Sequence, residues 1–204
     1  MRIVRILPAI SILATLLFAT PVNAASSQVS ISIIDLAHFN PTTFSFPGAG
    51  AFDFHPGVVT VSQGGTVTWT DNGYDQHTVT SYTTKMTVNF EGVNVQLPIP
   101  DGHFDSGIQA PIQSGQSWSL NTAELSPGDY HYFCQIHPWM SSFVWVLDHP
   151  FAAVTDKEGN YEIKGVPAAE LSVKYWHESF DKTPKTEKIT IKGDTTKDFT
   201  VSAK

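Results

Sequence analysis

Residues 58–70 read Val58-Val59-Thr60-Val61-Ser62-Gln63-Gly64-Gly65-Thr66-Val67-Thr68-Trp69-Thr70. Apolar side chains recur at every second position on either side of Ser62–Gly65, and the paired glycines are typical of a turn. We therefore predict two strands, 58–61 and 66–70, joined as a hairpin.

The same period of two recurs along the rest of the chain, and no segment shows a sustained helical period. Short strands separated by turn residues predict an all-β fold, in particular a β-sandwich. The further strands that we expect are Val29–Leu36, Ser117–Leu120, Tyr130–Phe133, Phe143–Leu147, Tyr161–Ile163, Leu171–Trp176, Lys188–Ile191 and Asp198–Ser202.

The first 24 residues have the pattern of a signal peptide. Arg2 and Arg5 precede an apolar run from Ile6 to Ala19, and Pro21-Val22-Asn23-Ala24 offers small residues before a cut after Ala24. The alternative is a membrane anchor, for which the run is short. We expect export to the periplasm or the extracellular space, without stable membrane insertion.

Charge and cysteine content exclude several classes of function. The 204 residues contain 12 Lys and Arg against 19 Asp and Glu, and removal of Arg2 and Arg5 with the signal peptide leaves a net charge of −9. Nucleic-acid binding needs a basic surface and is disfavoured. The single cysteine, Cys134, rules out an internal disulfide framework, a four-cysteine zinc site and an iron–sulfur cluster held by this chain alone.

The composition also divides the exported part of the chain. Residues 25–148 contain one basic and ten acidic residues, whereas residues 149–204 contain nine of each. This asymmetry predicts a domain boundary near Asp148. We expect one domain over 25–148 and a second, smaller one over 149–204.

Candidate metal ligands are concentrated in Tyr130-His131-Tyr132-Phe133-Cys134-Gln135-Ile136-His137-Pro138-Trp139-Met140. Cys134, His137 and Met140 supply a thiolate, an imidazole and a thioether at intervals of three. A type 1 copper site needs a second histidine in addition to these donors, and His77 follows the strand that ends near Asp71. Zinc could bind the same atoms, but the thioether and the apolar surroundings favour copper.

At these residues the sequence resembles the cupredoxins, the small blue copper proteins, and in particular plastocyanin and amicyanin. The resemblance covers about residues 28–148 and includes the strand 128–134, the short loop from Cys134 to Met140, and the segment His77-Thr78-Val79-Thr80-Ser81. It implies a Greek-key sandwich with one copper near one end, held by His77, Cys134, His137 and Met140. It also implies single-electron transfer and no catalytic residues.

The sequence departs from this family at two places. Thr78 stands where plastocyanin and amicyanin have an asparagine that ties the two ligand loops together, and its hydroxyl is the candidate substitute. The stretch between His77 and Cys134 is also longer than in the compact members. Its surplus, near residues 82–103, includes Val93-Asn94-Val95-Gln96-Leu97, which alternates like an extra strand.

Residues 149–204 resemble a different family, the carboxypeptidase regulatory-like, transthyretin-related β-sandwich. The resemblance lies in Thr155-Asp156-Lys157-Glu158-Gly159-Asn160-Tyr161-Glu162-Ile163, although Pro167 is followed by Ala168 rather than glycine. It implies a small β accessory domain.

The sequence thus predicts an exported electron carrier whose partners are redox proteins such as a cytochrome, a dehydrogenase or an oxidase. The cupredoxin resemblance further implies that His137 presents its ring edge at the surface beside Trp139. Two alternatives stay open, a copper chaperone or storage protein and a cell-envelope binding module with a structural copper. The first is disfavoured because only Met86 and Met140 follow the signal peptide.

Overall fold

The computed structural model describes residues 11–14, 26–35, 52–156, 158–177 and 184–200. Their secondary structure is β throughout, with twelve strands and no helix, which confirms the predicted all-β class. Among these residues no helix is both long and apolar enough to cross a membrane.

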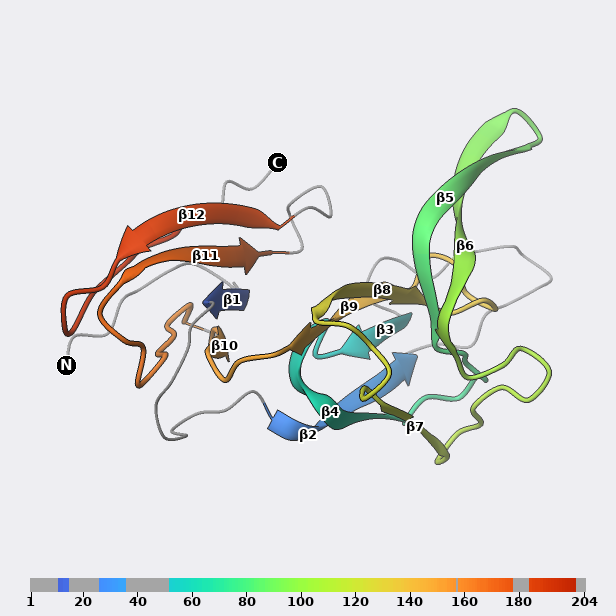
Figure 1. Cartoon of the computed structure of the whole chain (residues 1–204). Helices are drawn as coiled ribbons and strands as arrows, with labels where there is room; N and C mark the ends of the chain where they lie inside the picture. The colour runs from blue at the N-terminus through green and yellow to red at the C-terminus, as the bar shows by residue number, and fades with distance from the viewer. Residues whose placement is uncertain (1–10, 15–25, 36–51, 157, 178–183, 201–204) are drawn as a thin grey trace. The chain divides into compact units, whose positions relative to one another are not determined.

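The chain forms two compact units, of which the first spans Ser27–Val146 (Figure 1). Its strands are hydrogen-bonded in the order β3-β2-β4-β9-β8-β5-β6, and β7 pairs with β4 beside this path. Neighbours such as β4 with β9 and β5 with β8 are far apart in sequence, as in a Greek-key arrangement. The strands are β2 (Ser26–Asp35), β3 (Phe52–His55), β4 (Val58–Asp71), β5 (Thr80–Phe90), β6 (Val93–Asp105), β7 (Ser117–Asn121), β8 (Gly128–Phe133) and β9 (Ser141–Leu147).

The predicted hairpin over residues 58–70 is wrong, because the structure has a single strand, β4, over this stretch. Gly64 has a φ of 81°, which glycine adopts without steric cost. The strand therefore continues through this residue in spite of its positive φ. Gly65 lies where a side chain would collide with its surroundings: a Cβ there would be 2.8 Å from the Ser62 carbonyl oxygen and 2.9 Å from that of Ser27. Gly65 thus permits a close approach of the β4 and β2 backbones, Gly64 supplies the positive φ, and the chain does not reverse at either residue.

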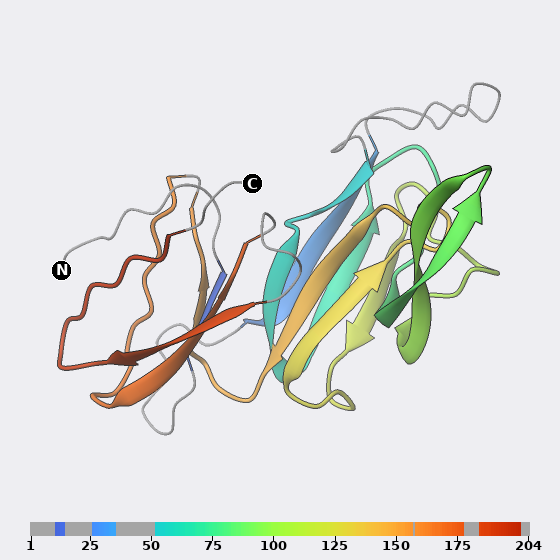
Figure 2. The ribbon, with the colours of Figure 1, turned by 90° about the horizontal axis from the view of Figure 1, so that it is seen from above.

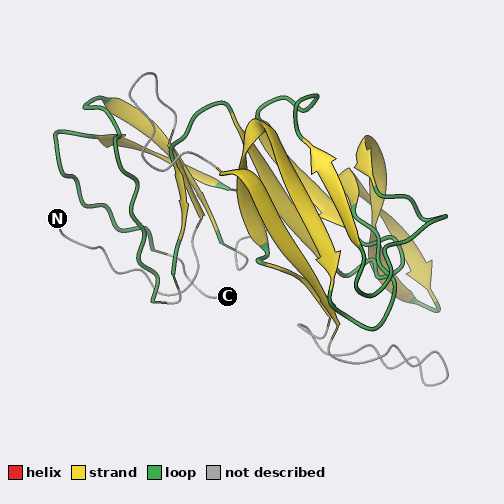
Figure 3. Ribbon diagram, turned by 90° about the horizontal axis from the view of Figure 1, so that it is seen from below, coloured by secondary structure: helices red, strands yellow, loops and turns green. Residues whose placement is uncertain are grey.

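Figure 3 shows the strands of this unit, whose buried core is aromatic and aliphatic. Trp69 and Tyr132 are fully buried, with ring centroids 5.4 Å apart, and Phe54 packs edge-on against Tyr132 at 4.8 Å. Cys134 and Met140 belong to the same buried cluster. The candidate ligands therefore lie at the margin of a close-packed core, which limits their movement.

The extra strand expected near residues 93–97 is confirmed as part of β6, which pairs with β5 in a long hairpin. Figures 1 and 2 show this hairpin extending beyond β8, which pairs with β5 only at Thr80 and Ser81. Alternation places Met86, Val88, Val95 and Leu97 on one face of the ribbon. Met86 and Val95 on this face are exposed.

The second unit contains a four-stranded sheet in the order β10-β1-β11-β12. Its strands are β1 (Ser11–Ala14), β10 (Ala152–Val154), β11 (Glu170–Trp176) and β12 (Lys185–Thr190). The strands predicted near 171–176 and 188–191 are thus present. Tyr161 makes only an isolated bridge, and residues 198–200 are not in a strand. Of the predicted signal peptide the structure describes only β1, which pairs with β10 and β11; the rest lies outside the described residues.

The close approach at Gly65 generates a stability prediction. Gly65→Ala should lower the free energy of unfolding by about 1–3 kcal/mol, because the added methyl group overpacks β4 against β2. Gly57→Ala is the matched control, since its Cβ would meet no atom closer than 3.9 Å. Chemical denaturation of both variants measures the difference, and equal stability of the two would contradict the packing described here.

Candidate metal centre

His77 and Cys134 come from separate parts of the first unit and are fully buried. His77 lies between β4 and β5, where its backbone N–H donates to the Ile112 carbonyl at 3.0 Å and its carbonyl accepts from Ile112 at 2.8 Å. Cys134 follows β8 directly. The two hydrogen bonds to Ile112 fix the His77 backbone, and the end of β8 fixes that of Cys134.

His137 and Met140 belong to a short loop that closes on Cys134. The Cys134 N–H donates to the Met140 carbonyl at 3.1 Å, and the Met140 N–H donates to the His137 carbonyl at 2.9 Å. Pro138 restricts the backbone between these two bonds. The loop therefore holds its residues in one compact turn.

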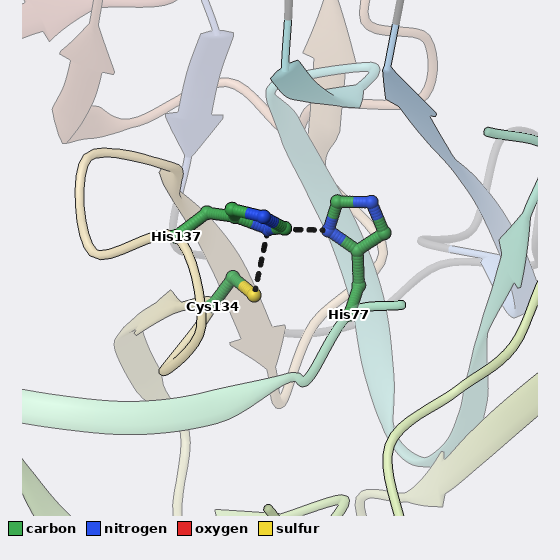
Figure 4. Close-up of side chains that lie close together, drawn as sticks. All are labelled: His77, Cys134 and His137. Carbon is green, nitrogen blue, oxygen red and sulfur yellow. Dashed lines mark hydrogen bonds between the residues drawn. The ribbon is translucent and has the colours of Figure 1, made fainter. Parts of the chain in front are cut away.

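Three side chains converge on one point (Figure 4). The Nδ1 atoms of His77 and His137 are 3.3 Å apart, and His137 Nδ1 is 3.6 Å from Cys134 Sγ. One ligand atom from each of the three residues lies within 4.8 Å of the others. The predicted grouping of these residues is therefore found in the structure.

Two of the three separations between these atoms fit one small metal ion. Ligand nitrogens about 2.0 Å and sulfur about 2.3 Å from a common ion are separated by roughly 3.3–3.8 Å at angles between tetrahedral and trigonal. The observed separations of 3.3 and 3.6 Å fall in this interval. Two imidazoles and one thiolate are the in-plane donors of a type 1 copper site, so the donor set also fits copper.

Met140 was predicted as the fourth ligand, and its placement is compatible with that role. Its side chain is 2% exposed and belongs to the same buried cluster as Cys134. A weak axial thioether is the donor that distinguishes a copper site of this type from a zinc site. Its ligation stays a prediction.

Thr78 connects the two ligand segments, as the sequence analysis suggested for its hydroxyl. Its Oγ1 accepts a hydrogen bond from the Gln135 N–H at 2.8 Å. Its own N–H donates to Cys134 Sγ at 3.3 Å. A single threonine thus ties the loops together and places a donor on the sulfur, and hydrogen bonds of this kind tune a metal-bound thiolate.

Asp35 is a functional candidate that the sequence analysis missed. Its carboxylate is buried, and Oδ2 lies 3.3 Å from His77 Nε2. When the Nε2–H donates to this carboxylate, the Nδ1 lone pair is left to face Cys134 and His137. The signal was present in the sequence, because Asp35 continues the inward register of Ile31 and Ile33 in the predicted strand.

The electrostatics of the group favour a thiolate. Burial raises the pKa of the Cys134 thiol, but hydrogen bonds from His137, His77 and the Thr78 N–H outweigh it and lower the pKa to about 6. Burial lowers the pKa of His77, but its contact with the Cys134 sulfur and the nearby carboxylates of Asp71 and Asp35 raise it overall. Without metal, these contacts stabilise the Cys134 thiolate and the protonated His77 imidazole. A bound metal ion would take the place of the imidazole proton as the positive charge beside the thiolate.

Little of His137 reaches the surface, although the cupredoxin resemblance implied a ring edge there. His137 is only 4% exposed, whereas Trp139 is 43% exposed. Their ring centroids are 5.4 Å apart. The indole thus provides the larger surface beside the group, because the loop turns the His137 ring towards His77 and Cys134.

The lowered thiol pKa can be measured directly. In metal-free protein, the ultraviolet absorbance of the Cys134 thiolate should titrate near pH 6, with the thiolate present above this pH and lost below it. The same chain unfolded in denaturant should titrate near 9, the ordinary value for the thiol. Cys134→Ser supplies the baseline, and a folded-state transition as high as the unfolded one would contradict the described hydrogen bonds.

Comparison with known proteins gives matches in structure only. No protein-family model matches the sequence, and no curated protein sequence matches it. A purple cupredoxin from Nitrosopumilus maritimus is 25% identical, with a TM-score of 0.38, over 58% of this chain and 99% of its own. A plastocyanin from Dryopteris crassirhizoma is 18% identical over the same shares, with a TM-score of 0.38.

Amicyanin from Paracoccus versutus is 19% identical, with a TM-score of 0.34, over 63% of this chain and 85% of its own. These matches are partial, and the resemblance of residues 149–204 to the carboxypeptidase regulatory-like domain finds no support among them. The function proposed below therefore rests on the side chains of this chain.

Proposed function

We propose that this protein is a type 1 copper protein that carries single electrons between redox partners outside the cytoplasm. The observation that carries the proposal is the convergence of His77 Nδ1, His137 Nδ1 and Cys134 Sγ at separations that suit one ion. Copper bound there would alternate between Cu(II) and Cu(I) and so hold or release one electron. Residues 25–148 form the copper-binding domain in this proposal, and residues 149–204 form an accessory domain.

The chain's own residues suit such a role because they are held in place without the metal. Backbone bonds fix His77 to Ile112 and close the loop from Cys134 to Met140. A carrier exchanges electrons fast when little atomic rearrangement accompanies the change in charge, and a prefixed ligand set limits that rearrangement. The four candidate ligands, His77, Cys134, His137 and Met140, are all buried, so we propose a carrier and not an enzyme.

The first experiment is a redox titration of the copper-loaded protein. Wild type should bind one copper per chain and cycle reversibly with one electron, and Cys134→Ser should lose this cycle, because serine oxygen is a poor ligand for Cu(I). His103→Ala is a matched control, since His103 lies outside the ligand group. A protein that binds copper tightly but does not cycle reversibly would favour the chaperone, storage or structural-copper alternatives.

Trp139 and the acidic surface generate a prediction about partners. An exposed indole beside His137 offers apolar contact area, and the −9 charge after signal-peptide removal attracts basic partners. Trp139→Ala should slow electron exchange about tenfold or more with small redox complexes while it preserves the visible spectrum. Stopped-flow kinetics with a cationic cobalt complex and with ferricyanide measure this effect.

The same kinetics test the charge. The rate with the cationic complex should fall as salt rises, and the rate with the anionic one should rise, because salt screens attraction and repulsion alike. Rates independent of salt would remove the electrostatic part of the proposal. Loss of the visible band in Trp139→Ala would show that the indole supports the site instead of forming a docking surface.

A further inference from the structure

The Asp35 carboxylate accepts N–H donors from three residues. Its Oδ2 accepts from the Asp75 N–H at 2.6 Å and lies 3.3 Å from His77 Nε2, and its Oδ1 accepts from the Tyr74 N–H. Two backbone N–H groups and the imidazole are arranged around the two oxygens, a set of donors that favours the ionised carboxylate. Asp35 thus places a full negative charge on the side of the His77 ring that faces away from the sulfur.

The chain makes room for this carboxylate at Gly73. A Cβ at Gly73 would lie 2.5 Å from Asp35 Cγ and 2.8 Å from Oδ2, distances that real Cβ atoms do not show. Gly73 itself is fixed, because its N–H donates to Asp71 Oδ1 at 2.9 Å. The turn after β4 therefore wraps the Asp35 carboxylate with backbone N–H groups and tolerates no side chain beside it.

A carboxylate paired with a ligating histidine has two effects on the metal. It fixes the tautomer and the ring orientation, and it increases the electron density on the ligating nitrogen. The first effect keeps the ligating nitrogen directed at the metal, and the second favours the more highly charged ion. Among the charged groups near His77, Asp71 is also buried, but its Oδ1 is bonded to Gly73 and not to the imidazole.

We propose that Asp35 is a positioning residue that holds His77 Nδ1 towards the metal and stabilises Cu(II) relative to Cu(I). This inference rests on the proposed function, since it concerns the same copper site. Its consequence is that Asp35 sets the reduction potential of the site below the value that His77, Cys134, His137 and Met140 would give alone.

The test is a potentiometric titration of the copper-loaded variant Asp35→Asn, in which the reductant supplies one electron per copper. Asparagine has one acceptor oxygen for the three donors and no charge. We expect the ratio of Cu(II) to Cu(I) affinities to fall at least tenfold, which raises the potential by about 59 mV for one electron. The control is Asp101→Asn, whose carboxylate accepts from Ser81 and Thr83 and touches no ligand.

Gly73→Ala provides an independent route to the same result. The added methyl group displaces the Asp35 carboxylate from His77, although the variant keeps all charged residues. The reduction potential should therefore rise, as in Asp35→Asn. This variant keeps the proposal testable where Asp35→Asn does not fold. Zinc-loaded protein adds a second readout, because the His77 Nε2–H should give a slowly exchanging NMR signal in wild type and in Asp101→Asn, but not in Gly73→Ala.

The outcomes separate this inference from the function on which it rests. A copper-loaded wild type with reversible redox chemistry, and a potential unchanged in both Asp35→Asn and Gly73→Ala, would overturn the role of Asp35 and leave the carrier function intact. A wild type without reversible copper chemistry would overturn the function itself. Potentials raised in both variants, but not in Asp101→Asn, would establish the role.

Discussion

Two backbone pairs between β5 and β8, Thr80 with Phe133 and Ser81 with Tyr132, bring the two halves of the candidate metal centre together. His77 and His137 are 60 residues apart in sequence, and without this pairing they share no local structure. The contact is reinforced next to the pairing, where Thr78 bonds to Gln135 and to the Cys134 sulfur. The ligand geometry is thus a consequence of strand pairing rather than of the ligands themselves.

The hydrogen bonds around the candidate metal centre compensate for the burial of its charged groups. The side chains of His77, Cys134 and His137 are buried and lose the solvation of water, so an isolated charge there would be costly. Hydrogen bonds from the ring nitrogens and the Thr78 N–H compensate the sulfur, and Asp35 compensates His77. A bound cation would serve the same purpose, which is why a buried group of this composition is better explained by a metal than by stability alone.

The sequence supported the all-β class because strand alternation is a local signal, and it paired Cys134 with His137 because their spacing of three is local too. His77 is distant in sequence and was predicted because a type 1 copper site needs a second histidine. It did not predict the continuity of β4, where Gly64 and Gly65 looked like a turn. Gly64 instead adopts a positive φ within the strand, and Gly65 packs closely against the backbone of β2. The pairing of Asp35 with His77 spans 42 residues and depends on how β2 lies beside β4, so periodicity alone could not locate it. The burial of His137 likewise follows from the fold of its loop, which the motif does not specify.

The proposed function requires that Cys134 sulfur binds copper together with His77 and His137. The visible absorption spectrum of the Cu(II)-loaded protein tests it most directly, because a thiolate bonded to Cu(II) gives an intense charge-transfer band. The Cu(II)-loaded protein should be blue or green and should hold one copper per chain. A protein that shows only the weak absorption of Cu(II) bound through nitrogen and oxygen, or that stays colourless and retains zinc in competition with copper, would contradict it.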